Sequence, residues 1–363
     1  MMEYDRKLVL EDGTSFYGCS FGADREVLAE VVFNTSMVGY QEILSDPSYT
    51  GQAVVMTYPL IGNYGMCRED YETDTPTVTA MIVREYNPEP SNFRSEETLD
   101  AVMRRFGIVG LAGVDTRQLA RHIRDRGTCK ALITRGDTPT IACIAFLRGK
   151  DLPRDQIARV STKDTWRSPA DKGRLHVAAV DCGMKKNILR SLNARGCDVT
   201  VLPWTVTAEA VAALKPDGLF LSNGPGDPAD AAPVIALVRQ LRGKLPIFGI
   251  CLGHQILALA CGAETYKLKF GHRGGNHPVK NLKTGRVEIT AQNHSYAVRP
   301  ESLAGTGLEV THVNLLDGTV EGLCSREDRV LSVQYHPESA PGPQDSGYLF
   351  DEFIAMMEEA GHA

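Results

Sequence analysis

The chain has 363 residues, of which 43% are hydrophobic and 23% are charged, and its formal net charge is −6. This composition is typical of a globular protein large enough for two domains, and it offers no long basic run for binding nucleic acid. No window approaches the roughly 18 consecutive apolar residues of a membrane span, and the charged N-terminus lacks the apolar stretch of a signal peptide.

The nine cysteines are scattered along the chain and are never spaced as C-x-x-C. They therefore indicate neither a disulfide framework nor a zinc site. The pattern favours mostly buried thiols in a reducing cytoplasm, and we expect no metal.

Residues 1–135 combine short strand-like runs with loops rich in Gly, Asn, Pro and Asp, and helical patterns follow later. One helix is predicted with Ser95 as its cap and Gly107 past its end. Residues 115–126 repeat the scheme, with Gly127 ending the helix. This region is predicted to be an α+β domain.

Residues 136–174 are richer in charge and proline, and they are expected to form a connecting segment. From residue 175 to 363, near-continuous apolar strands alternate with helices, which predicts an α/β domain with an open, mostly parallel sheet covered on both faces. Residues 286–339 then predict mostly antiparallel strands, with Asp317-Gly318 in a hairpin turn.

The sequence "GICLG", residues 249–253, has the form of a nucleophile elbow, a sharp turn between a strand and a helix. The flanking glycines leave room for neighbouring segments, and the amino end of the following helix favours a thiolate at Cys251. The N–H of Leu252 is placed to donate to an oxyanion. A buried cysteine at a tight strand–helix junction is the alternative that this pentapeptide alone leaves open.

The sequence "YHPE", residues 335–338, offers a base for such a nucleophile. Pro337 favours an extended conformation at His336, and residues two apart in an extended chain face the same side. Glu338 can therefore bond one imidazole nitrogen and leave the other for Cys251. Taken alone, the tripeptide His336-Pro337-Glu338 is more often a surface loop than a catalytic motif.

Three further segments expose amide or imidazole groups. The turn "LSNGPGDP" (221–228) can bind an anion through backbone N–H groups, although it is no Walker loop. Residues 292–295 and 271–278 are predicted to be loops. Metal binding is conceivable at His272 and His277, but no carboxylate or cysteine spacing supports it.

The three motifs, in this order, resemble those of the class I (triad) glutamine amidotransferases, and the resemblance covers residues 175–360. It implies that Cys251 is the nucleophile, His336 the general base and acid, and Glu338 the residue that orients the histidine.

Within that class, "VVFNTSMVGYQEILSDPSYTGQ", "TYPLIGNYG", "GVDTRQL", "KFGHRGGNHPV" and "TAQNHSYAV" resemble the small-subunit family of glutamine-hydrolysing carbamoyl-phosphate synthetases. The resemblance implies that L-glutamine is held by groups at Ser48, Gly224, Gly226, Leu252, Gln255, Asn293, Ser295 and Tyr296. Ser295 stands where the family often has Gly, and it suits that position if its backbone N–H is what binds but not if a positive φ is needed.

The same resemblance implies a partner. Ammonia would pass to a separate large subunit, which uses bicarbonate and two ATP to make carbamoyl phosphate for arginine and pyrimidine biosynthesis. ATP and Mg²⁺ would bind that subunit, because this chain shows no nucleotide-binding motif and is expected to carry no cofactor. We expect this chain and the large subunit to form a heterodimer, or a higher oligomer of that heterodimer.

Other functions stay open at this point: an amidotransferase serving another synthase, such as those making anthranilate or GMP, a non-catalytic regulatory or scaffolding subunit, and a cysteine peptidase. Residues 1–135 argue against the first, and the intact Cys251, His336 and Glu338 argue against the second.

Overall fold

The computed structural model describes residues 4–361 and divides into two compact units, one up to Pro153 and one from Arg154. The division falls inside the segment predicted to be a connection. That segment is itself structured: α4 (Thr140–Arg148) belongs to the first unit, and α5 (Gln156–Val160) and β10 (Trp166–Ser168) belong to the second.

The first unit is built on a closed barrel. Around the barrel, the strands are β1 (Arg6–Leu10), β2 (Ser15–Gly22), β8 (Val109–Ala112), β6 (Ala80–Ile82), β4 (Gln52–Met56), β3 (Val27–Asn34) and β9 (Cys129–Arg135). A separate pair comprises β5 (Leu60–Ile61) and β7 (Glu85–Tyr86), and the helical elements are α1 (Tyr40–Ser45), η1 (Pro47–Tyr49), η2 (Arg68–Asp70), α2 (Leu99–Phe106) and α3 (Thr116–Arg126). Helices and strands thus mix in this unit, as predicted for an α+β domain.

Helix α2 begins later than the sequence suggests. Thr98, not Ser95, is its cap, and the Thr98 hydroxyl accepts a hydrogen bond from the N–H of Ala101 at 3.2 Å. Ser95 lies in a preceding turn, with its N–H bonded to the carbonyl of Asn92. The predicted end at Gly107 is correct, with a left-handed φ of 70°.

The second unit is built on one sheet. Its strands follow the order β10, β12 (Cys197–Pro203), β11 (Leu175–Asp181), β13 (Gly218–Leu221), β14 (Ile247–Ile250), β19 (Val330–Val333), β18 (Val320–Ser325), β17 (Glu309–Asn314), β15 (Thr265–Asn281) and β16 (Val287–Val298). Strands β12, β11, β13, β14 and β19 run parallel, and the pairs from β19 to β16 are antiparallel. The predicted α/β class is confirmed.

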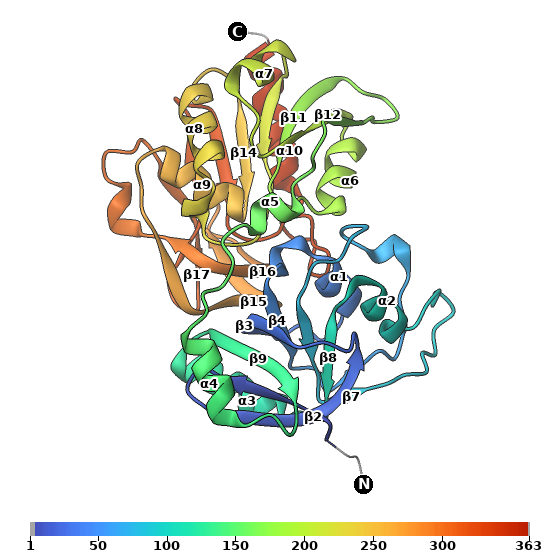
Figure 1. Ribbon diagram of the computed structural model, residues 1–363. Coiled ribbons are helices and arrows are strands. Elements are labelled where there is room, and N and C mark those ends of the chain that lie inside the picture. Colours follow the sequence, from blue (N-terminus) through green and yellow to red (C-terminus); the bar gives the residue numbers. More distant parts are fainter. Residues whose placement is uncertain (1–3, 362–363) are drawn as a thin grey trace. The chain divides into compact units, whose positions relative to one another are not determined.

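Helices cover both faces of the parallel strands (Figure 1). Helices α8 (Ala232–Leu241) and α9 (Leu252–Ala260) lie on one face, and α6 (Lys186–Ala194) and α10 (Tyr348–Gly361) lie on the other. Residues of β11 alternate between the two cores: Ala178 and Val180 pack toward α8 and α9, and Val177 and Ala179 toward α6 and α10. Burial on both sides explains the continuous apolar runs. The remaining helical elements are α7 (Ala208–Ala213), η3 (Pro228–Asp230) and η4 (Pro300–Leu303).

The loop predicted at 271–278 is wrong, because this segment lies in β15. Residues 292–295 also lie in a paired strand, β16, which confirms the strand predicted from residue 286 and not a loop at 292–295. His272 is opposite His294 and Arg273 is opposite Asn293 in the ladder of β15 and β16. The register shifts on either side of this stretch, and Gly271 there has a φ of 71°. Glycine tolerates such a bulge, so the strand continues through residues that resemble a loop.

Among residues 4–361, no helix combines the length and the apolar character that crossing a membrane would require.

Candidate active site

The candidate site lies where neighbouring parallel strands end. Strands β11, β13, β14 and β19 are adjacent in the sheet, and their carboxyl ends share one edge. The segments that follow them carry, in that order, Lys185, Gly224, Cys251 and His336. This edge is where open α/β sheets bind their ligands.

Cys251 occupies a strained turn between β14 and α9. Its φ of 55° and ψ of −103° lie outside the usual regions for a residue with a side chain, and it is the N-cap of α9. A Cβ on Gly249 would lie 2.7 Å from the carbonyl oxygen of Gly253, and one on Gly253 would lie 2.3 Å from that of Leu221. Both glycines therefore provide clearance that any side chain would remove.

Cys251 is only 3% exposed, and its thiol donates to the carbonyl of Asn293 at 3.5 Å. Leu252 is the first residue of α9, so its N–H belongs to the first turn, whose donors have no acceptor within the helix. The nucleophile candidate and an N–H donor are thus neighbours at one helix start.

His336 and Glu338 form the pair that the sequence predicts. The Nδ1 of His336 lies 2.7 Å from the Oε1 of Glu338, and the Glu338 side chain is fully buried. The other nitrogen of His336, Nε2, is buried and makes no hydrogen bond to the described residues. Burial alone would lower the pKa of His336, but the Glu338 carboxylate and the neighbouring Cys251 outweigh it and raise that pKa.

Lys185 joins this pair and was missed by the sequence analysis. Its Nζ donates to Oε1 of Glu338 at 2.9 Å and to the carbonyl of Ala340 at 2.7 Å, and its side chain is 4% exposed. Burial would raise the pKa of Glu338, but the Lys185 ammonium and His336 together lower it. The carboxylate thus stays ionised beside the Lys185 ammonium and the His336 imidazole.

The turn after β11 holds Lys185 in place. The Asp181 carboxylate accepts hydrogen bonds from the N–H groups of Gly183 and Met184, both at 2.8 Å. The N–H of Lys185 donates to the side chain of Asn223, which follows β13. The position of Lys185 just after a central strand was a sign of a role in the site. Lysine is so often exposed, however, that the sequence alone did not single this residue out.

The predicted glutamine contacts of the second unit gather around this edge. The Nε2 of Gln255 donates to the carbonyl of Tyr296 at 2.8 Å, and the Tyr296 hydroxyl donates to Asp227 at 3.1 Å. Gly224 is confined, since a Cβ there would lie 2.2 Å from the carbonyl oxygen of Cys182. Gly226 has a φ of 93°, which favours glycine.

Ser295 is not one of the described residues that have a positive φ, so its backbone conformation accommodates a side chain. Its hydroxyl accepts a hydrogen bond from the buried Arg273 on the neighbouring strand. Ser48 belongs to the first unit, in η1, where its N–H donates to Asp46 at 2.9 Å. Its contact with glutamine stays a prediction.

Comparison with known proteins bears on both units. The family model described as "Glutamine amidotransferase class-I" matches residues 178–356, and that described as "Carbamoyl-phosphate synthase small chain, CPSase domain" matches residues 8–133. The chain is 56% identical over 354 residues to a protein from Bacillus caldolyticus named carbamoyl phosphate synthase small chain, with 98% of this chain and 97% of that one covered.

Two further relatives are similar over nearly the same length. A protein of the same name from Fusobacterium nucleatum is 55% identical, covering 98% of this chain and 99% of that one. One from Halalkalibacterium halodurans, named carbamoyl phosphate synthase pyrimidine-specific small chain, is 53% identical, with 98% of each chain covered.

Proposed function

The chain belongs to the family of carbamoyl phosphate synthase small chains, which hydrolyse L-glutamine and deliver the ammonia to a large subunit, and we propose that Cys251, His336 and Glu338 carry out its glutaminase reaction. The observation that supports this assignment is the strained Cys251 turn beside the His336–Glu338 pair, at neighbouring strand ends.

In the first step, His336 takes the thiol proton at Nε2 while the sulfur of Cys251 attacks the side-chain carboxamide carbon of glutamine. The C–N bond then breaks as His336 returns a proton to the nitrogen, which leaves as ammonia. In the second step, His336 takes a proton from water as the water attacks the thioester. The C–S bond breaks as His336 returns that proton to the sulfur, which releases glutamate and regenerates the free thiol.

Glu338 and Lys185 support His336 through both steps. The Glu338 carboxylate accepts from Nδ1, so the histidine presents Nε2 to the reacting atoms and its transient charge is stabilised. Lys185 donates to the same carboxylate oxygen, Oε1, and keeps the carboxylate ionised and fixed. Lys185 is therefore a positioning residue.

The oxyanion of each tetrahedral intermediate is assigned to the N–H of Leu252 and to a backbone amide of the 224–226 turn. One such donor contributes about 3 kcal/mol to transition-state stabilisation. Residues Ser48, Gln255, Asn293, Ser295 and Tyr296 are assigned to holding the rest of the substrate.

The ammonia serves a large subunit that is proposed to consume bicarbonate and two ATP, with Mg²⁺, to form carbamoyl phosphate for arginine and pyrimidine biosynthesis. The chemistry needs Cys251 reduced, and all nine cysteines of the chain are free thiols. That supports a reducing compartment such as the cytoplasm.

The decisive variant is Cys251→Ala, assayed in the complex with the large subunit. Glutamine-dependent carbamoyl phosphate synthesis should fall by more than about 10³-fold, because the nucleophile is lost. Synthesis from free ammonia should be unchanged. Cys261→Ala, at the other end of α9, is the matched control and should retain both activities.

Glutamine-driven synthesis that survives Cys251→Ala would refute the assignment. Failure to trap a thioester from labelled glutamine on the wild-type chain would favour a scaffolding role, and cleavage of peptides without glutaminase activity would favour a peptidase.

A further inference from the structure

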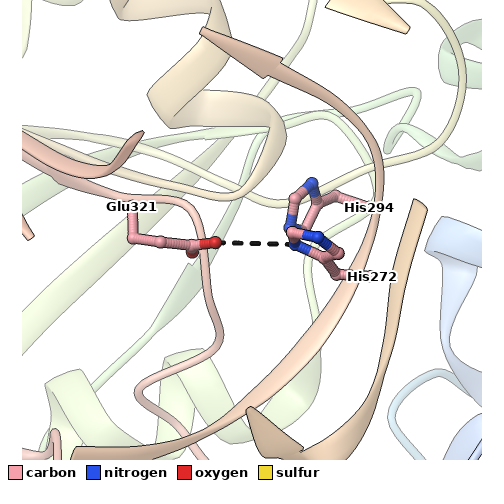
Figure 2. Close-up of side chains that lie close together, drawn as sticks. All are labelled: His272, His294 and Glu321. Atoms are coloured by element: carbon pink, nitrogen blue, oxygen red, sulfur yellow. Dashed lines mark ion pairs between the residues drawn. The ribbon is translucent and has the colours of Figure 1, made fainter. Parts of the chain in front are cut away.

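A second polar cluster lies within the antiparallel part of the sheet, apart from the reacting groups. His272 of β15, His294 of β16 and Glu321 of β18 are all buried, and one potential metal-ligand atom from each lies within 4.8 Å of the others. Figure 2 shows the Glu321 carboxylate directed at the two imidazole rings, with the ion pair between His272 and Glu321 marked. The sequence could not show this carboxylate, because 49 residues separate it from His272.

His272 is held as a metal-binding histidine would be. Its Nε2 lies 2.9 Å from the Oδ2 of Asp317, so a neutral ring donates outward through Nε2 and has on Nδ1 the lone pair that a metal ion would bind. That Nδ1 is buried, has no hydrogen-bond partner among residues 4–361, and lies 3.6 Å from the Oε1 of Glu321. Two ligands sharing one tetrahedral ion at about 2.1 Å are separated by roughly this distance.

His294 has the same arrangement. Its Nδ1 lies 2.7 Å from the carbonyl oxygen of Tyr296, which can only accept, so this nitrogen carries a proton. Its Nε2 faces the Oε1 of Gln292 at 2.8 Å. The Gln292 amide cannot turn freely, because its Nε2 donates to Glu321 at 3.0 Å.

The buried spot therefore gathers lone pairs. With the proton of His294 on Nδ1, its Nε2 and the oxygen of Gln292 confront each other as acceptors, beside Nδ1 of His272 and the Glu321 carboxylate. Such a convergence is stabilised by a cation between the groups.

We propose that His272, His294 and Glu321 bind a divalent transition-metal ion, zinc by their ligand set, with Gln292 or water at the remaining position. Two imidazoles and one carboxylate are ligands that Zn²⁺ accepts, and both histidines have an outer acceptor for their second N–H. The ion ties β15, β16 and β18 together behind residues 293–296. Its role is structural, since the reaction at Cys251 uses none of these groups.

The purified full chain, stripped with a chelator and dialysed against Zn²⁺, should retain about one zinc per molecule. Co²⁺ in its place should give the visible absorption bands of a low-symmetry four- or five-coordinate ion. Glu321→Gln should weaken Zn²⁺ binding at least about tenfold, and His272→Asn should abolish it. Zn²⁺ should raise the melting temperature of the wild-type chain and leave that of His272→Asn unchanged.

Two buried residues of the same sheet serve as matched controls. His312 of β17 bonds Thr311 and Tyr348, and Glu288 of β16 bonds Ser346 and Tyr348, so neither belongs to the cluster. His312→Asn and Glu288→Gln should bind zinc as the wild type does.

Substoichiometric zinc and no cobalt bands in the folded wild type would overturn the proposal and leave His272 as a protonated partner of its two carboxylates. If His272→Asn and Glu321→Gln both bound zinc as tightly as the wild type does, the metal would lie elsewhere, and the proposal would be overturned as well. Because the readouts are metal content and spectra, they are independent of whether Cys251 is the nucleophile.

Discussion

The two halves of the second unit's sheet work in different ways. In the parallel half, the reacting groups come from segments just beyond strand ends, as Cys251 follows β14 and His336 follows β19. In the antiparallel half, Asn293 and Tyr296 lie inside β16 and contact Cys251 and Gln255 through backbone carbonyls. The parallel half thus provides the reacting side chains from short turns. The antiparallel half forms one side of the site, and the position of that side depends on the neighbouring strands.

This difference determines how each half responds to mutation. A turn beyond a strand end is specified by a few adjacent residues, so a single change there removes a reacting group or its support. A strand interior is held by many ladder hydrogen bonds, so one side chain matters less unless it binds something itself.

Lys185→Met should have the largest effect of the tests below, because it removes the ammonium from Glu338. A buried carboxylate without its partner gains a proton more easily, and His336 then loses its charged acceptor. We expect kcat for glutamine hydrolysis to fall about 10²-fold, the lower end of what a positioned general acid–base contributes.

The pH profile separates this role from simple destabilisation. The Lys185 ammonium lowers the pKa of Glu338, so its removal raises that pKa, and the acidic limb of kcat/KM should move to higher pH. Lys244→Met, on the exposed surface, should change neither parameter. An unchanged acidic limb in Lys185→Met would contradict the positioning role.

The features that the sequence predicts correctly lie mostly in the local turns, and those that it misses lie mostly in the paired strands. The Cys251 turn, the His336–Glu338 pair and the glycine ends of α2 and α3 were predicted, because each depends on residues within a few positions of one another. The strand at 271–278 was not, because its glycines and histidines resemble a loop until β16 pairs with them.

Lys185 and Glu321 illustrate the remaining limit. Lys185 contacts a carboxylate 153 residues away, and Glu321 approaches a histidine 49 residues away. No spacing rule connects such pairs, since the strand order of the sheet alone brings them together. Side chains that act across strands therefore require the tertiary structure.

Gly253→Ala tests the clearance on which the parallel half depends. Ala is ordinarily the better helix former by about 1 kcal/mol, but here its Cβ would lie 2.3 Å from the Leu221 carbonyl oxygen. We expect the free energy of unfolding to fall by about 1–3 kcal/mol, measured by urea denaturation. Gly149→Ala, whose nearest contact would be 3.5 Å, should cost no more than about 0.5 kcal/mol. If the two variants had the same free energy of unfolding, the turn would accommodate a Cβ at residue 253, and the clearance argument would be wrong.

Ser295→Gly should have the smallest effect, and it tests whether the antiparallel half binds glutamine through backbone or side chains. Ser295 has no positive φ in the described chain, and its hydroxyl accepts from Arg273. Its assigned contribution is its N–H, which glycine also has, so KM for glutamine should change less than about twofold at constant kcat, a free-energy difference below about 0.5 kcal/mol. Ser295→Ala should behave alike, because it loses only the hydroxyl. An increase in KM of tenfold or more in both variants would instead make the hydroxyl a direct contact with the substrate, so that the strand interior would depend on a single side chain as much as the strand ends do.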